Sequence, residues 1–134
     1  SNINNSPIIL LFAFLWPFFL SAKIDFVHQV MPILKKNCAE CHTDGKKKGG
    51  LSMNTRAEFL AGGENGVMAV PGNIQDSWFL ELVESDDLDE RMPPKGPGVS
   101  TEQFRILHQW VKEGMVWERQ RHGFLTRLRR AHMA

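Results

Sequence analysis

Residues 38–42 read Cys-Ala-Glu-Cys-His, and this pentapeptide decides how the rest of the sequence is interpreted. Cys38 and Cys41 are the only cysteines among 134 residues, so no disulfide can link distant parts of the chain. Thiols three positions apart lie on one side of a helical turn, which takes about 3.6 residues. Both thiols can therefore reach one edge of a single flat ligand, with His42 directly underneath it. The pentapeptide predicts a ligand-binding site.

The spacing C-x-x-C-H is the signature of covalent c-type haem attachment. Each thiol would bond one vinyl group, and His42 would reach the iron. A structural zinc site needs four ligands, and the chain offers three here without a second cluster. A thioredoxin-like dithiol needs a preceding strand and a βαβ context, which the sequence lacks. We therefore expect one covalently attached haem c, held by Cys38 and Cys41, with His42 as an axial ligand.

The second axial ligand is expected from a loop past the middle of the chain. The methionines are Met31, Met53, Met68, Met92, Met115 and Met133. Met92 precedes two prolines, and a residue before proline is restricted to extended backbone, so its thioether can be held rigidly. We predict Met92 as this ligand and Met68 as the next choice, whereas His28 or His108 would give a bis-histidine haem.

Helices are predicted at both ends of the haem-binding part of the chain. Asp25 can cap a helix with an apolar face that runs from Phe26 to about Asn37, directly before the cysteines. Ser100 and Gln103 form the start of a capping box for a last helix, which Gly114 ends.

Shorter helices and loops are predicted between these two. One short helix is expected over 55–61 and another over 75–84, the second burying Trp78, Phe79 and Leu82. The stretches 43–52 and 86–99 are rich in glycine, proline and polar residues and predict loops. Strand-like alternation is absent, so the sequence predicts an all-α domain over residues 24–118.

The two ends of the chain predict contact with a membrane. Ile8 to Ala22 is fifteen residues without a charge, and residues 1–23 are read as a membrane anchor or a helix docked on membrane subunits, with an uncleaved signal sequence as the alternative. Either reading sends the following domain across a membrane. Residues 119–134 contain five arginines and no acid, and this basic tail can lie on anionic lipid or an acidic subunit, or stay solvated.

Residues 24–118 resemble the planctomycete-type cytochrome c domain, a member of the class I cytochrome c superfamily. The matching segments are residues 24–42, 47–60, 70–83, 89–96 and 100–118. The resemblance implies one covalent haem wrapped by an N-terminal helix, a C-terminal helix crossing it and the methionine loop between them. It also implies an aromatic contact between Phe26 and Trp110, and makes Arg56, Trp78 and Arg91 candidates for haem propionate contacts.

Filled axial positions leave no site for a substrate, which favours electron transfer over enzymatic chemistry. We expect a one-electron carrier that is a membrane-anchored subunit of a larger complex, on the periplasmic side of a bacterial inner membrane. Redox proteins and membrane subunits are the expected partners, and the acidic stretch 81–90 would orient a basic one. A net charge of +1 gives no reason to expect nucleic acid. The alternatives are a haem-stabilised assembly subunit, or a domain serving a dehydrogenase or peroxidase.

Overall fold

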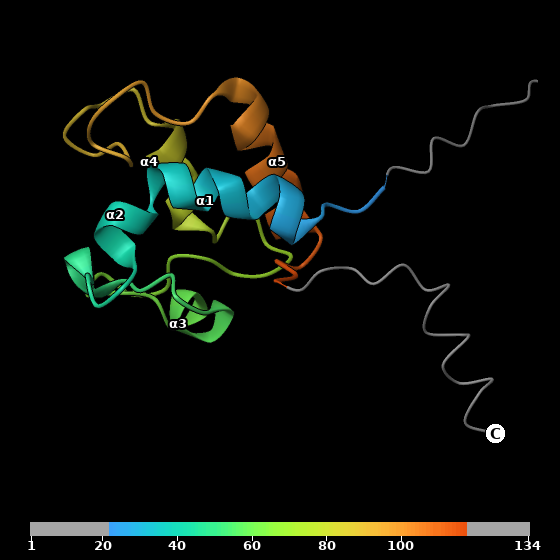
Figure 1. The fold of residues 1–134 in the computed structure, drawn as a ribbon, viewed down its shortest axis with the longest axis horizontal. Helices are drawn as coiled ribbons and strands as arrows, with labels where there is room; N and C mark the ends of the chain where they lie inside the picture. Colours follow the sequence, from blue (N-terminus) through green and yellow to red (C-terminus); the bar gives the residue numbers. More distant parts are fainter. Residues whose placement is uncertain (1–21, 118–134) are drawn as a thin grey trace, which may run out of the picture.

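The computed structural model describes residues 22–117, which are coloured in Figure 1. The predicted apolar anchor, apart from its last two residues, and the basic tail lie outside these residues. Within 22–117 the regular elements are all helical and no strand forms, which confirms the all-α prediction for this part of the chain. Isolated bridges join Gly63 to Gly66 and Val70 to Asn73. Over the same range, no helix is long and apolar enough to cross a membrane.

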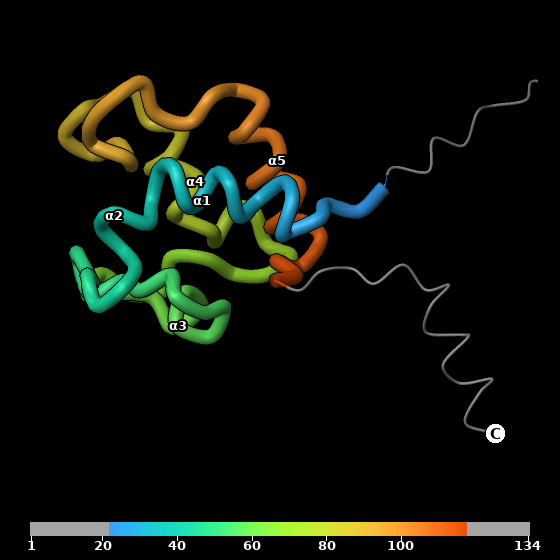
Figure 2. The backbone as a smooth tube through the Cα atoms, viewed as in Figure 1, coloured from blue at the N-terminus to red at the C-terminus, as the bar shows by residue number. Residues whose placement is uncertain are grey.

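The described elements follow the chain as a series of short helices joined by long loops (Figures 1 and 2). They are η1 (Phe26–Val30), α1 (Met31–Asn37), α2 (Ala39–His42), η2 (Lys48–Gly50), α3 (Arg56–Ala61), α4 (Trp78–Glu84) and α5 (Thr101–Lys112).

The N-terminal helix begins as a π-helix, η1, and continues as α1. Asp25 caps it by accepting a hydrogen bond from the backbone N–H of His28 at 3.1 Å. A second hydrogen bond, to the His28 ring, and this backbone bond lower the pKa of the Asp25 carboxyl. Pro32 lies just after the junction of η1 and α1, and its missing N–H removes one hydrogen bond from the continuous helix. The helix predicted from Phe26 to Asn37 is therefore confirmed, with a π-helical first turn.

The two ends of the described chain meet where η1 packs against α5. The rings of Phe26 and Trp110 stack with centroids 5.8 Å apart, which confirms the contact implied by the resemblance. Trp117 stacks closer on Phe26, at 4.3 Å. The backbone N–H of Ile24 donates to the Glu113 carboxylate at 2.8 Å. These contacts fix the N-terminal helix across the C-terminal one.

The last helix starts as predicted, with the capping box of Ser100 and Gln103 fully formed. It buries Leu107, Trp110 and Val111. After α5 the chain turns through Gly114 and Met115, whose φ angles are +97° and +53°. Met115 is fully buried and belongs to the core.

Arg56, at the start of α3, joins this turn to the rest of the fold. Its Nε donates to the carbonyl of Met115 at 2.9 Å, and its Nη2 donates to the carbonyl of Gly114 at 3.2 Å. The guanidinium thus satisfies carbonyls beyond the end of α5, where backbone acceptors lack partners within the helix.

Replacing Arg56 with alanine is expected to lower the free energy of unfolding by about 1–3 kcal/mol, because two partly buried carbonyls lose a charged donor. Chemical denaturation of the purified protein measures this change. Arg105→Ala is the matched control, since Arg105 is exposed and pairs with Glu102 on the surface of α5. The control should change the free energy by less than about 0.5 kcal/mol. Equal effects of the two substitutions would contradict the role given to Arg56.

The helix predicted over 75–84 is shorter than expected, and the side chains that it buries differ from those predicted. It begins at Trp78, because Asn73 closes a turn by accepting from the N–H of Asp76 at 3.1 Å. The next residue, Ser77, is fully buried and donates to the carbonyl of Asn73 at 2.7 Å. Phe79 is buried as predicted. The burial predicted for Trp78 is wrong, because its side chain is 37% exposed, and Leu82 is only half-buried.

Candidate functional site

The two cysteines are positioned by the junction between α1 and α2. The N–H of Cys38 still bonds the carbonyl of Leu34, at 2.9 Å, as the last hydrogen bond of α1. The carbonyl of Cys38 then accepts from the N–H groups of both Cys41 and His42, at 3.2 and 3.1 Å. A single tight turn therefore carries both thiols and the histidine, as the spacing predicts. Both cysteines are free and partly buried.

His42 is held in one orientation by the segment that follows η2. Its Nδ1 lies 3.1 Å from the carbonyl oxygen of Leu51, and this carbonyl can only accept a hydrogen bond. Nδ1 therefore carries the proton, and Nε2 is left with a free lone pair. The backbone N–H of Met53 also donates to the His42 carbonyl at 2.7 Å. Such a bond to the second ring nitrogen is the usual way in which proteins orient a metal-binding histidine.

One cavity brings the predicted site residues together. It has a volume of about 720 Å³, within the usual range of ligand sites, about 300–1,000 Å³. Cys38, Cys41, His42 and Met92 all border it. Its apolar lining comes mainly from α4, α5 and the segments next to them, and includes Met68, Trp78, Phe79, Leu82, Val99 and Leu107. A large, mainly apolar cavity with two thiols and an imidazole on its wall fits a haem attached through both cysteines.

Met92 reaches this cavity from the long loop between α4 and α5. The N–H of Met92 donates to the carbonyl of Leu82 at 2.9 Å, which ties the loop to α4. The side chain is 39% exposed and borders the cavity. The loop between α4 and α5 and the helix α2 lie at the same end of the molecule in Figure 1. The structure therefore places the Met92 thioether and the His42 imidazole on one cavity.

The other candidates for the second axial ligand are placed differently. Met68 also borders the cavity, but it is 9% exposed and belongs to the core. His28 and His108 do not border it. His28 is bonded to Asp25 at the start of η1, and the ring of His108 packs near that of Phe104. The choice between Met92 and Met68 stays a prediction.

The environment of Cys38 opposes the redox interpretation of the pentapeptide. Burial, together with the nearby Cys41 thiol, raises the pKa of the Cys38 thiol to about 12. Redox-active cysteines have lowered pKa values, because the thiolate is the reactive form. Over residues 22–117, no three histidine, cysteine or acidic side chains converge on a metal position.

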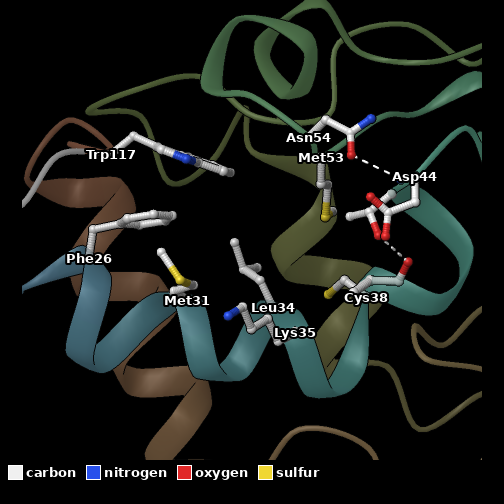
Figure 3. A pocket seen from close by; sticks show the side chains of 11 residues that line it. Phe26, Met31, Leu34, Lys35, Cys38, Asp44, Met53, Asn54 and Trp117 are labelled. Atoms are coloured by element: carbon white, nitrogen blue, oxygen red, sulfur yellow. Dashed lines mark hydrogen bonds between the residues drawn. The ribbon is translucent and has the colours of Figure 1, made fainter.

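A second, smaller cavity also borders Cys38. Its volume is about 320 Å³. Figure 3 shows the rings of Phe26 and Trp117 at one end of it and Cys38 with Met53 at the other. The hydrogen bond from the N–H of Asp44 to the side-chain oxygen of Asn54, 3.0 Å long, lies beside it. Cys38 therefore stands between two cavities, of which only the larger also borders Cys41 and His42.

The three candidates for propionate contacts have different positions. Trp78 borders the large cavity from the start of α4. Arg56 does not border it, and its guanidinium binds the carbonyls beyond α5, so a propionate contact by Arg56 gains no support from the structure. Arg91 does not border the cavity either, and its guanidinium binds carbonyls of its own loop.

Sequence reasoning missed the Leu51 carbonyl, which orients His42. A backbone carbonyl leaves no signal in residue type, so only the chain path after η2 reveals it. The stacking of Trp117 on Phe26 was also missed. An aromatic residue shortly after a predicted helix end could have indicated that the chain packs back against the core.

Comparison with known proteins finds a similarity that covers these residues. A family model described as Planctomycete cytochrome C matches residues 38–96, which contain Cys38, Cys41, His42 and Met92. No curated protein and no solved structure matches the chain. Residues 38–96 are therefore similar to planctomycete cytochrome c.

Proposed function

We propose that this protein is a monohaem c-type cytochrome that carries single electrons between protein partners. The family supports a haem-binding electron carrier. The observation that carries the proposal is the convergence of Cys38, Cys41, His42 and Met92 on one apolar cavity. When bound there, the haem iron supplies reversible one-electron oxidation and reduction.

The chain's own residues would hold the group in three ways. Cys38 and Cys41 provide two covalent tethers on one turn. His42 offers Nε2 to the iron, because its Nδ1 is bonded to Leu51. Met92 offers a thioether, which with histidine favours ferrous iron and raises the reduction potential relative to two histidines.

Electron exchange would take place where the cavity meets solvent. Trp78 and Met92 both border the cavity. Two filled axial positions leave no place for a substrate, which favours a carrier over a peroxidase. Glu90 also borders the cavity, and Leu88 of the same acidic stretch is 65% exposed. This combination suits a partner surface that is basic around an apolar centre.

The proposal is tested on the full chain, produced in a bacterium with a c-type haem maturation system. The purified protein should be red and should keep its haem in acidified acetone. A pyridine haemochrome spectrum should correspond to two thioether bonds, and a redox titration should fit one electron. The protein should bind carbon monoxide slowly or not at all. A colourless product, or haem released into acidified acetone, would contradict the proposal.

We further propose that the domain faces the periplasm and is anchored by residues 8–22. In this case the haem-loaded protein should stay in membranes washed with alkaline carbonate. The control replaces residues 1–23 with a cleavable signal peptide and should yield haem-loaded protein in the soluble periplasmic fraction. Full-length protein that is released by carbonate in the same way as the control would argue against the anchor.

A further inference from the structure

Residues 93–99, which follow Met92 in the loop between α4 and α5, lack backbone hydrogen bonds of their own. Residues 93–99 read Pro-Pro-Lys-Gly-Pro-Gly-Val, and the three prolines have no N–H to donate. Among the described residues, no N–H between 93 and 99 donates a backbone hydrogen bond. Gly96 and Gly98 have φ angles of +76° and +77°. The backbone of Met92 is tied to α4 by its bond to the Leu82 carbonyl, but residues 93–99 depend on other contacts to stay in place beside the cavity.

Arg91 supplies that support from inside the loop. Its Nε donates to the carbonyl of Pro93 at 3.2 Å, and its Nη2 donates to the carbonyl of Gly96 at 2.7 Å. Its backbone N–H bonds the carbonyl of Asp87 at 2.7 Å, which fixes the base of the side chain. A side chain at Gly98 would lie 3.6 Å from the guanidinium, so the returning loop passes close beside it. The Arg91 side chain thus connects the loop backbone at Pro93 with the loop backbone at Gly96.

The polar contacts of the Arg91 guanidinium are all with carbonyls of its own loop. Arg91 lies next to an acidic stretch, yet within residues 22–117 it forms no ion pair with a carboxylate. Its polar contacts go to two loop carbonyls on either side of the turn. A planar guanidinium donates several N–H groups in fixed directions and can bind two acceptors at once, which the single ammonium of lysine does less well.

We propose that Arg91 is a positioning residue for Met92. By bonding Pro93 and Gly96 it holds the loop closed, so that the Met92 thioether stays at the cavity and the iron's sixth position is not exposed. This inference rests on the proposed function, because it takes Met92 as the axial ligand. The bracing of the loop itself can be measured independently of that ligand.

The test compares Arg91→Gln and Arg91→Lys with the matched control Arg105→Gln. Arg105 is an exposed arginine on α5, so the control removes the same charge away from the loop. The first readout is the association rate of imidazole with the ferric protein, which requires Met92 to leave. The second is the rate of cleavage after Lys95 by a lysine-specific protease, mapped by mass.

Arg91→Gln should raise both rates by about tenfold, which corresponds to about 1.4 kcal/mol. Arg91→Lys should raise imidazole association less, and Arg105→Gln should match the wild type. Unchanged rates in Arg91→Gln, while Met92→Leu binds imidazole faster, would overturn the proposal and leave the proposed function intact.

Two other outcomes are also decisive. If Met92→Leu binds imidazole no faster than the wild type, Met92 is not the axial ligand. Faster cleavage in Arg91→Gln would then show only that Arg91 holds the loop in place, not that it positions a ligand. If Arg91→Gln fails to fold, Arg91→Lys carries the comparison through imidazole association, and a wild-type rate would overturn the proposal.

Discussion

Replacing both Cys38 and Cys41 with serine is expected to remove all covalently bound haem from the protein. Serine has nearly the same size as cysteine but cannot form the thioether. Without the tethers, haem would be held only by axial ligands and by packing in a cavity of about 720 Å³ whose edge is open to solvent. Haem staining after denaturing electrophoresis measures the loss directly, and extraction with acidified acetone should then release any haem that co-purifies.

The single variants give the more informative comparison. Cys38→Ser and Cys41→Ser should each keep one thioether, so both should retain stainable haem with a pyridine haemochrome band at longer wavelength than the wild type. Ala39→Ser is the matched control, because it places the same hydroxyl between the cysteines and removes no thiol. Haem that resists acidified acetone in the double variant would contradict the attachment.

Local signals in the sequence predicted the parts of the fold that depend on neighbouring residues. The pentapeptide 38–42 places both thiols on one turn, because its spacing matches a helical turn. Asp25 and Ser100 cap their helices because a short polar side chain can bond the first N–H groups. Met92 reaches the cavity, as its position before two prolines suggested. Each of these features is decided within a few residues.

Features that depend on distant partners could not be predicted. Arg56 carried no signal for the carbonyls of Met115 and Gly114, which lie almost sixty positions away. Trp78 looked like a core residue because it is large and apolar. Its exposure follows from the Asn73 turn, which delays the helix until Trp78 and turns this side chain towards the cavity. The sequence predicts a haem, but it does not show that the face of Trp78 lines the cavity rather than the core.

The second large effect concerns the sixth ligand of the iron. Met92→Leu is expected to remove the weak long-wavelength band of methionine-bound ferric haem and to allow carbon monoxide to bind the ferrous protein. The reduction potential should fall by on the order of 0.1 V or more, within the roughly 0.8 V that axial ligands span. Leucine is suitable because it conserves volume while removing the sulfur, so the loop should keep its packing. Visible spectroscopy and a redox titration provide the measurements.

Met68→Leu is the matched control, because both methionines border the same cavity and both substitutions remove one sulfur. If Met92 is the ligand, Met68→Leu keeps the band and changes the potential little. If the band is lost in Met68→Leu and kept in Met92→Leu, the ligand comes from the core segment before α4, and the loop braced by Arg91 only covers the cavity. A band absent from the wild type, together with rapid binding of carbon monoxide, would mean an open iron. An open iron can take a substrate, which would favour a peroxidase over a carrier.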